Sequence, residues 1–217
     1  MIRMYHLTKR YGDVVALRDI NLRVAKGEFC YITGPSGAGK STLLKLLYGA
    51  EKPTEGKLLV GGVDISRLPS SRLPAMRRSM GIVFQDFKLI TTRSVKENIG
   101  LALEVIGTPR ELIERRVGAV LAIVGLRGRG DEYPLTLSGG EQQRVAVARA
   151  IINDPSIVIA DEPTGNLDGA MAIEVMEILQ SINLRGTTVL VATHDAGLME
   201  RFPYRRLRFE QGKLVQS

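Results

Sequence analysis

The chain has 217 residues, of which 44% are hydrophobic and 24% are charged, and its formal net charge is +7. This length and composition suit one large domain with a buried core and exclude global disorder. No stretch approaches the roughly 18 consecutive apolar residues of a membrane span, and the N-terminus lacks the apolar segment of a secretion signal. We therefore expect a cytoplasmic protein that needs a partner to act at a membrane.

The first part of the chain predicts strands and one helix. Apolar and polar residues alternate over 20–24, which is the pattern of a half-buried strand. The single cysteine, Cys30, lies in the next apolar run, so we expect a buried thiol and no disulfide within the chain. Leucines at helical spacing follow over 41–50, and 56–65 predicts a hairpin that turns at two glycines.

The middle of the chain predicts helices. Thr108 and Glu111 have the spacing of a helix capping box, with a proline between them at the first turn. We interpret 88–136 as a helical subdomain inserted into an α/β core formed by 1–87 and 137–217.

The last part of the chain predicts parallel strands and a hairpin. The segments 156–160 and 187–192 are almost wholly apolar, and strands that are apolar on both faces belong in a parallel sheet covered by helices. Each ends in polar residues, and sites in open α/β sheets collect at the carboxyl ends of strands. The tail predicts a hairpin that turns at Gly212.

The stretch GPSGAGKST has the spacing G-x-x-x-x-G-K-[ST] of a phosphate-binding loop. Its residues are Gly34, Pro35, Ser36, Gly37, Ala38, Gly39, Lys40, Ser41 and Thr42. The glycines let backbone N–H groups approach a polyanion at the N-terminus of a helix. Lys40 can reach the β- and γ-phosphates, and the Ser41 hydroxyl can ligate Mg²⁺. Because an apolar strand precedes the loop and an amphipathic helix follows it, we predict a nucleotide site.

Two adjacent carboxylates, Asp161 and Glu162, follow the apolar strand 156–160. Regular alternation of side chains breaks down at a strand end, so one carboxylate can face Mg²⁺ while the other faces the γ-phosphate. We assign Asp161 to the metal and Glu162 to the attacking water, which it would polarise or deprotonate. A solvated strand end is the alternative for such a pair alone.

The stretch LSGGEQQR contains a second predicted capping box, Ser138 with Glu141. The start of this helix displays Ser138, Gly139 and Gly140, whose hydroxyl and backbone N–H groups can bind an anion. A well-capped helix without a ligand is the alternative for this pattern alone.

Taken together, GPSGAGKST, LSGGEQQR and IVIADEPTGNLD resemble the Walker A, signature and Walker B motifs of the ATP-binding cassette (ABC) ATPases, in the family's order. The stretch FQD at 84–86 resembles the family's Q-loop, and VATHD at 191–195 resembles its switch-histidine loop. The resemblance covers nearly the whole chain. It implies an α/β fold with a P-loop NTPase core, a mainly parallel sheet, an N-terminal antiparallel β-subdomain and an inserted α-helical subdomain.

The resemblance also implies ATP and Mg²⁺ as ligands and a head-to-tail homodimer, in which the signature of one subunit completes the nucleotide site of the other. By the same resemblance, Gln85 senses Mg²⁺ and the attacking water, and His194 contacts the γ-phosphate. Asp168 would touch the Walker A region of the opposite subunit. Tyr11 stands where an aromatic residue stacks on adenine, although a packed aromatic in a turn is the alternative.

The segment after the Q-loop implies an integral membrane partner. Phe87, Leu89 and Ile90 are candidate docking residues, or they are ordinary core of the helical subdomain. The stretch VFQDFKLI with TRSVKENIGLALEVIG resembles the cell-division branch of the family, which implies a peripheral position at the cytoplasmic face of the plasma membrane. An ATPase subunit of a lipoprotein-releasing or efflux transporter is the alternative. We expect no nucleic-acid partner, because aromatic residues are few and do not alternate with a basic stripe.

Overall fold

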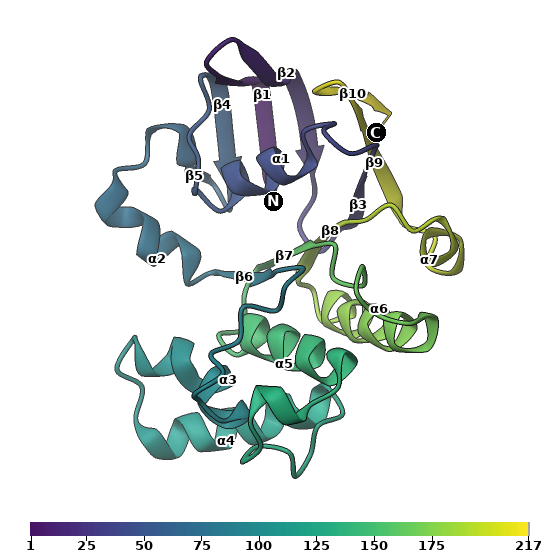
Figure 1. The fold of residues 1–217 in the computed structure, drawn as a ribbon. Helices are drawn as coiled ribbons and strands as arrows, with labels where there is room; N and C mark the ends of the chain where they lie inside the picture. Colours follow the sequence, from purple (N-terminus) through teal and green to yellow (C-terminus); the bar gives the residue numbers. More distant parts are fainter. Residues whose placement is uncertain (217) are drawn as a thin grey trace.

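Across residues 1–216, which the computed structural model describes, the chain forms two β-sheets and seven α-helices (Figure 1). The first sheet is antiparallel and has the strand order β2-β1-β4-β5. Its strands are β1 (Ile2–Tyr11), β2 (Val14–Val24), β4 (Glu55–Val60) and β5 (Val63–Asp64).

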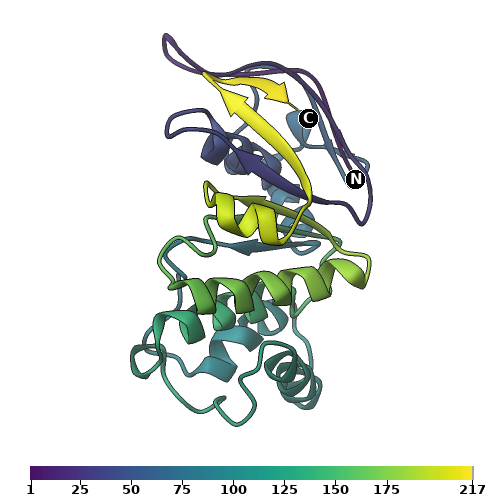
Figure 2. The same cartoon turned by 90° about the vertical axis from the view of Figure 1, so that its right-hand side faces the viewer.

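The second sheet is mainly parallel and has the strand order β10-β9-β3-β8-β7-β6, with only β10 antiparallel to its neighbour. Its strands are β3 (Phe29–Thr33), β6 (Met80–Val83), β7 (Ile157–Asp161), β8 (Thr188–Ala192), β9 (Arg205–Glu210) and β10 (Lys213–Gln216). In the view of Figure 2, the β9–β10 hairpin rises from this sheet toward the antiparallel one.

The helices lie on both faces of the parallel sheet (Figures 1 and 2). They are α1 (Lys40–Leu47), α2 (Leu73–Arg77), α3 (Val95–Glu104), α4 (Arg110–Ile123), α5 (Gly139–Ile151), α6 (Gly169–Leu184) and α7 (Ala196–Arg201), with short 3₁₀ turns at Ile65–Arg67, Ser70–Arg72 and Pro134–Thr136. Within residues 1–216, none of these helices combines the length and the apolar composition that a membrane span requires.

Two apolar cores lie on opposite faces of the parallel sheet. One joins the antiparallel sheet, the leucines of α1 and side chains such as Ile32 and Ile159. The other joins the helices α3 to α6 to side chains on the opposite face, such as Tyr31 and Val158. Because α3 and α4 share this second core with α5 and α6, the exact limits that we gave the helical subdomain remain a proposal.

Most local predictions are confirmed. The alternation over 20–24 belongs to β2, in which Ile20, Leu22 and Val24 are buried and the residues between them are exposed. Strands β7 and β8 are buried on both faces and pair in parallel. Cys30 is buried. Both predicted hairpins are present, β4–β5 and β9–β10.

The predicted capping box at Thr108 and Glu111 is wrong. Helix α4 begins at Arg110, and its N-cap is Pro109, which has an extended conformation and no side chain that could accept a hydrogen bond. The Thr108 N–H instead donates to the carbonyl of Leu103 at 3.1 Å, so this residue completes the end of α3. The box of this region is one we did not predict, Ser94 with Glu97 at the start of α3.

Candidate nucleotide site

A cavity of about 890 Å³ lies at the carboxyl ends of the parallel strands. The whole loop 34–42, which follows β3, lines it, together with Gln85 after β6, Asp161 and Glu162 at the end of β7, and His194 after β8. The parallel register brings these four strand ends to one edge of the sheet. Residues that the sequence separates by up to 160 positions therefore face the same space.

The loop 34–42 depends on glycine at defined positions. Gly34 has φ 138°, and a Cβ there would overlap the carbonyl oxygen of Phe209. Gly39 has φ 102°, and a Cβ would lie 2.5 Å from the carbonyl oxygen of Ala16. Gly37 has φ 77° and open space where a Cβ would stand. The loop therefore packs against β9 at Gly34 and against β2 at Gly39, while Gly37 faces open space.

Lys40 is the first residue of α1, and its ammonium lies within the curve of the loop. Its Nζ donates to the carbonyl oxygens of Gly34 at 2.7 Å and Pro35 at 3.1 Å. Backbone N–H groups of the loop and the first turn of α1 supply further partial positive charge. This end of the cavity is suited to a polyanion.

A second part of the cavity wall, at the end of β7, carries the two carboxylates. Burial raises the pKa of the Asp161 carboxyl, the neighbouring Glu162 adds to the shift, and a hydrogen bond with Ser41 opposes it. Glu162 has φ 46°, a left-handed conformation that is uncommon for a residue with a side chain. The left-handed turn interrupts the alternation of the strand, and both carboxylates line the same cavity. This is the departure from regularity that the strand end predicts.

His194 completes this wall. Its Nδ1 lies 3.1 Å from both carboxylate oxygens of Glu162. The Glu162 side chain is 15% exposed, while that of His194 is 76% exposed. The exposed imidazole therefore contacts a carboxylate that is mostly buried. Two groups placed in this way can share a proton or orient a water between them.

The oxygen groups around Ser41 fit a hard divalent cation. The Ser41 hydroxyl, the Asp161 carboxylate and the Gln85 amide line the cavity, and oxygen is the ligand that Mg²⁺ prefers. Within residues 1–216, no group of three or more His, Cys, Asp or Glu side chains forms a protein-only metal site. This donor set fits Mg²⁺, which is commonly held by one or two carboxylates together with substrate phosphates.

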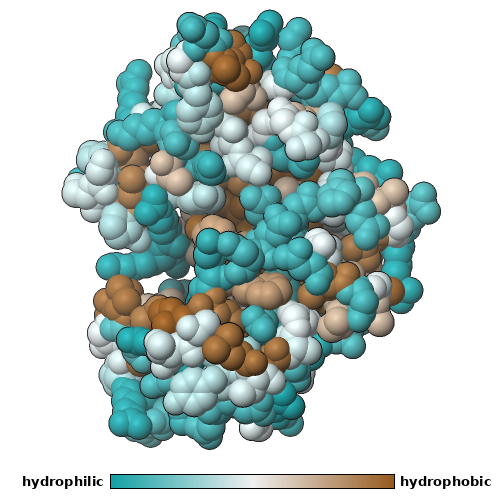
Figure 3. All heavy atoms as spheres, in the orientation of Figure 1, coloured by the Kyte–Doolittle hydropathy of each residue, from teal (hydrophilic) through white to brown (hydrophobic). Residues whose placement is uncertain are grey.

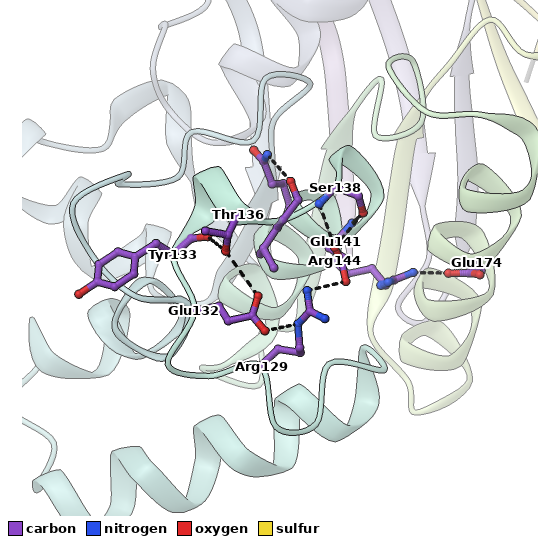
Figure 4. A network of polar contacts seen from close by, with 10 residues as sticks. Arg129, Glu132, Tyr133, Thr136, Ser138, Glu141, Arg144 and Glu174 are labelled. Atoms are coloured by element: carbon purple, nitrogen blue, oxygen red, sulfur yellow. Dashed lines mark hydrogen bonds and ion pairs between the residues drawn. The ribbon is translucent and has the colours of Figure 1, made fainter.

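Ser138, Gly139 and Gly140 start helix α5 and lie outside this cavity. The Ser138 backbone N–H donates to Glu141 Oε2 at 2.8 Å, and its hydroxyl donates to the same oxygen at 2.9 Å (Figure 4). Arg129 Nη2 lies 3.0 Å from the other oxygen of Glu141. The predicted capping box is confirmed. Ser138 is exposed and Gly139 is half-buried, but Gly140 is buried, so the prediction that it too is displayed is wrong for the single chain.

Asp168 and Tyr11 also lie outside the cavity lining. Asp168 is the N-cap of α6 and accepts a hydrogen bond from the Met171 N–H at 2.9 Å. Tyr11 ends β1, is 42% exposed, and has the Lys9 ammonium 4.7 Å from its ring centroid. The roles assigned to them stay predictions.

The sequence interpretation missed one wall of the cavity. This wall comes from β2 and from the turn between β9 and β10: Val14, Val15, Ala16, Arg18, Gln211 and Gly212. The Arg18 N–H donates to the Gly212 carbonyl at 2.7 Å, and the Gly212 N–H donates to the Ala38 carbonyl at 3.2 Å. No residue type or spacing marks these positions, because they become neighbours only when the two ends of the chain meet.

The fold and this arrangement of loop, carboxylates and capped helix define an ABC-type nucleotide-binding cassette. The family model described as ABC transporter matches residues 17–165. A dimeric post-hydrolysis structure of the ATP-binding cassette MJ0796, bound to ADP and Pi, superposes with a TM-score of 0.90 at 36% identity and covers 100% of this chain and 97% of that one. The chain belongs to the ABC ATPase family.

Within this family the chain is similar over its full length to the cell division ATP-binding protein FtsE. It is 47% identical to FtsE of Bacillus subtilis, with 100% of this chain and 96% of that protein covered. It is 45% identical to FtsE of Escherichia coli K12, with 99% and 97% covered. The predicted family and the predicted resemblance to its cell-division branch are both confirmed.

Proposed function

We propose that the chain binds ATP with Mg²⁺, hydrolyses it to ADP and phosphate, and acts in cell division as the cytoplasmic subunit of a membrane complex. The observation that carries this proposal is the convergence of the loop 34–42, Asp161, Glu162 and His194 on one cavity. A loop alone supports nucleotide binding, whereas a carboxylate pair in the same cavity, with a histidine beside it, supports hydrolysis.

In this mechanism Glu162 takes or polarises the proton of the attacking water. His194, 3.1 Å from that carboxylate, keeps the carboxylate and the water in line and contacts the γ-phosphate. Lys40 and the loop N–H groups offset the negative charge that develops on the phosphate oxygens. Ser41, Asp161 and Gln85 would hold Mg²⁺, which neutralises phosphate charge when it is bound.

We propose that two copies bind ATP head to tail. The start of α5 can bind an anion but lies outside the cavity of its own chain, so it is free to meet the γ-phosphate in a second copy. MJ0796 cassettes, which share the fold at TM-scores of 0.90 and 0.91, are dimeric. Ser138, Gly139 and Gly140 would then complete the partner's site, and Asp168 would lie at the same interface.

The membrane partner that we propose is an FtsX-like integral protein, through which ATP turnover controls cell-wall hydrolysis. The helical region offers it an apolar surface: Ile90, Val105 and Ile106 are 37%, 70% and 43% exposed. On the face shown in Figure 3, apolar surface gathers in a band across the helical half of the molecule. Phe87 and Leu89 are half-buried, and Leu89 packs against the core of the helical region.

This proposal places the chain at the cytoplasmic face of the plasma membrane, at the division site, with the partner supplying the membrane spans. An ATPase subunit of a lipoprotein-releasing or efflux transporter would use the same catalytic residues. The full-length similarity to FtsE favours the division role.

The test uses Glu162→Gln, which keeps the shape of the side chain and removes its charge. We expect this variant to bind ATP, to hydrolyse it at least about a hundredfold more slowly, and to form a dimer only with ATP and Mg²⁺. The measurements are turnover and the molar mass in solution. Lys40→Ala is the matched control, since it should lose nucleotide affinity and stay monomeric. A Glu162→Gln chain that turns over ATP at the normal rate would refute the assigned base.

Capture from native membranes with the trapped Glu162→Gln dimer then identifies the partner. Retention of an FtsX-like protein together with division proteins would support the division role. Retention of a lipoprotein-releasing or efflux permease would keep the ATPase chemistry and move the function to transport.

A further inference from the structure

The segment that follows Gln85 has an uncommon backbone. Phe87 and Lys88, two consecutive residues with side chains, have φ values of 56° and 50°. Left-handed conformations are unfavourable for such residues and persist only where the surroundings hold them. The Phe87 N–H donates to the Phe84 carbonyl at 3.3 Å, so this left-handed pair closes the turn that contains Gln85.

Arg149, in the last turn of α5, binds the carbonyls of both left-handed residues. Its Nη2 donates to the Phe87 oxygen at 2.7 Å, and its Nη1 donates to the Lys88 oxygen at 2.6 Å. The guanidinium is half-buried, and burial lowers its pKa. Its planar fork can reach two acceptors from two nitrogens at once, which a lysine ammonium cannot match in the same geometry.

A second side chain holds the far end of the same segment. Asn98, which is fully buried in α3, accepts from the Ile90 N–H at 2.8 Å, and its Nδ2, with two N–H donors, lies 3.0 Å from each of the carbonyl oxygens of Ile90, Arg93 and Ser94. The segment 87–94 is therefore fixed to α5 at its start and to α3 at its end. Gln85 lies between the end of β6 and the contact with Arg149.

We infer that Arg149 is a positioning residue, which holds Gln85 at the nucleotide cavity by fixing the left-handed Phe87–Lys88 turn. The same contact joins the C-terminal turn of α5 to the Q-loop, while the N-terminal turn of α5 carries Ser138. Helix α5 thus connects Ser138, on the surface proposed to meet a second copy, with the segment that carries Gln85, which lines the chain's own nucleotide cavity. The part of this inference that concerns hydrolysis rests on the proposed function.

The first test measures amide hydrogen exchange over 86–94 in the full chain. We expect Arg149→Gln to accelerate exchange there by at least about tenfold, because the turn loses its two charged hydrogen bonds, and to leave the loop 34–42 unchanged. Arg144→Gln is the matched control, since Arg144 lies on the same helix and pairs with Glu174 of α6 (Figure 4). Unchanged exchange over 86–94 in Arg149→Gln would overturn the inference, whether or not the chain hydrolyses ATP.

The second test separates positioning from general stability. Arg149→Gln should lower the kcat for ATP hydrolysis by about tenfold and change the Kd for ATP by less than about twofold. In the Arg149→Gln variant, the additional change Lys88→Gly should raise kcat about threefold, because glycine adopts positive φ without strain. Lys88→Ala removes the same side chain but keeps the Cβ, so it should recover nothing. Equal recovery by both, or a Kd that rises in step with the loss of kcat, would contradict positioning.

Arg149→Lys serves if the glutamine variant does not fold. It keeps the charge but cannot donate to both carbonyls from separate nitrogens, so we expect the same changes at about a third of the size. A wild-type chain without ATPase activity would refute the proposed function, and the exchange measurement would still decide whether Arg149 holds the turn.

Discussion

Helices α3 and α5 begin with the same capping box, a serine whose backbone N–H donates to a glutamate three residues later. The distances are 2.7 Å from Ser94 to Glu97 and 2.8 Å from Ser138 to Glu141. In both boxes the serine hydroxyl also meets the glutamate, at 2.8 and 2.9 Å. Locally, the two helix starts are almost the same structure.

Their surroundings differ. Ser94 is 5% exposed, and the next two N–H groups, those of Val95 and Lys96, donate to the carbonyls of Glu132 and Gly130 at 2.8 Å each. The first turn of α3 is thus already satisfied by the protein. Ser138 is exposed, and in the part of the chain that the structure describes no protein group accepts from the N–H of Gly139. The same four-residue pattern builds a closed helix end in α3 and an open one in α5.

A capping box by itself therefore does not indicate an anion site. Free N–H groups at a helix start attract anions, and only the packing around that start decides whether they are free. Matched substitutions at the two helix starts test this difference.

The largest expected change is in the free energy of unfolding, and it concerns the residue four positions after each serine, Asn98 in α3 and Gln142 in α5. Asn98→Leu in α3 should lower the free energy of unfolding by about 3 kcal/mol, because the Ile90 N–H and the carbonyls of Ile90 and Arg93 lose a buried partner. Gln142→Leu in α5 should cost less than about 1 kcal/mol, since Gln142 is half-buried and, within residues 1–216, donates only to the Leu137 carbonyl, at 3.1 Å. Urea unfolding measures the free energy of unfolding of both variants. Equal losses of stability would show that the two helix starts are buried to the same extent and would contradict the difference.

The next prediction concerns ATP turnover, which should differ between the serine variants of the two helix starts. Ser138→Ala should lower ATP turnover by about tenfold, since one donor to the γ-phosphate is lost in each composite site. Ser94→Ala should leave turnover per folded molecule within about twofold, because the α3 start is covered. Steady-state ATPase assays at saturating ATP give both values. A loss of turnover in Ser94→Ala as large as that in Ser138→Ala would remove the distinction that we draw.

The same two variants should differ little in stability. Each loses an N-cap hydroxyl, and such a loss costs about 1 kcal/mol of folding free energy. Thermal unfolding should therefore shift by a few degrees in both cases. If Ser138→Ala were much less stable than Ser94→Ala, its lower turnover would reflect unfolding and not a missing donor.

The smallest effect is a pH dependence that both helix starts share. Hydrogen bonds from the Ser94 backbone lower the pKa of Glu97, and those from the Ser138 backbone lower the pKa of Glu141. A carboxyl whose pKa is lower in the folded state stabilises the fold above its unfolded pKa, and this contribution is lost as the pH falls below that value. Below about pH 4.5, Glu97→Gln and Glu141→Gln should each lose less stability than the wild type, as urea unfolding across this range would measure.

Much of the nucleotide site could be predicted because its residues lie in short contiguous stretches. The loop 34–42 carries its glycines, Lys40 and Ser41 at fixed spacing, and the strand before Asp161 is apolar without interruption. Parallel pairing then follows from that apolarity, and it brings strand ends to a common edge. The wrong prediction at Thr108 also has a local cause. Pro109, the N-cap of α4, has no side chain that can accept a hydrogen bond, and the Thr108 N–H donates to the Leu103 carbonyl at the end of α3.

The family, the phosphate loop, the carboxylate pair and the strands that carry them could all be read from the amino-acid order, because each depends on spacing within a few residues. Three further features depend on how the chain packs: which capped helix is open, the contact of Arg149 with the turn after Gln85, and the cavity wall formed by the last hairpin. These contacts join residues 61 positions apart in the case of Arg149 and Lys88, and nearly 200 apart where Arg18 meets Gly212. Local propensity does not encode such pairs, because they form only when packing of the two cores brings the elements together.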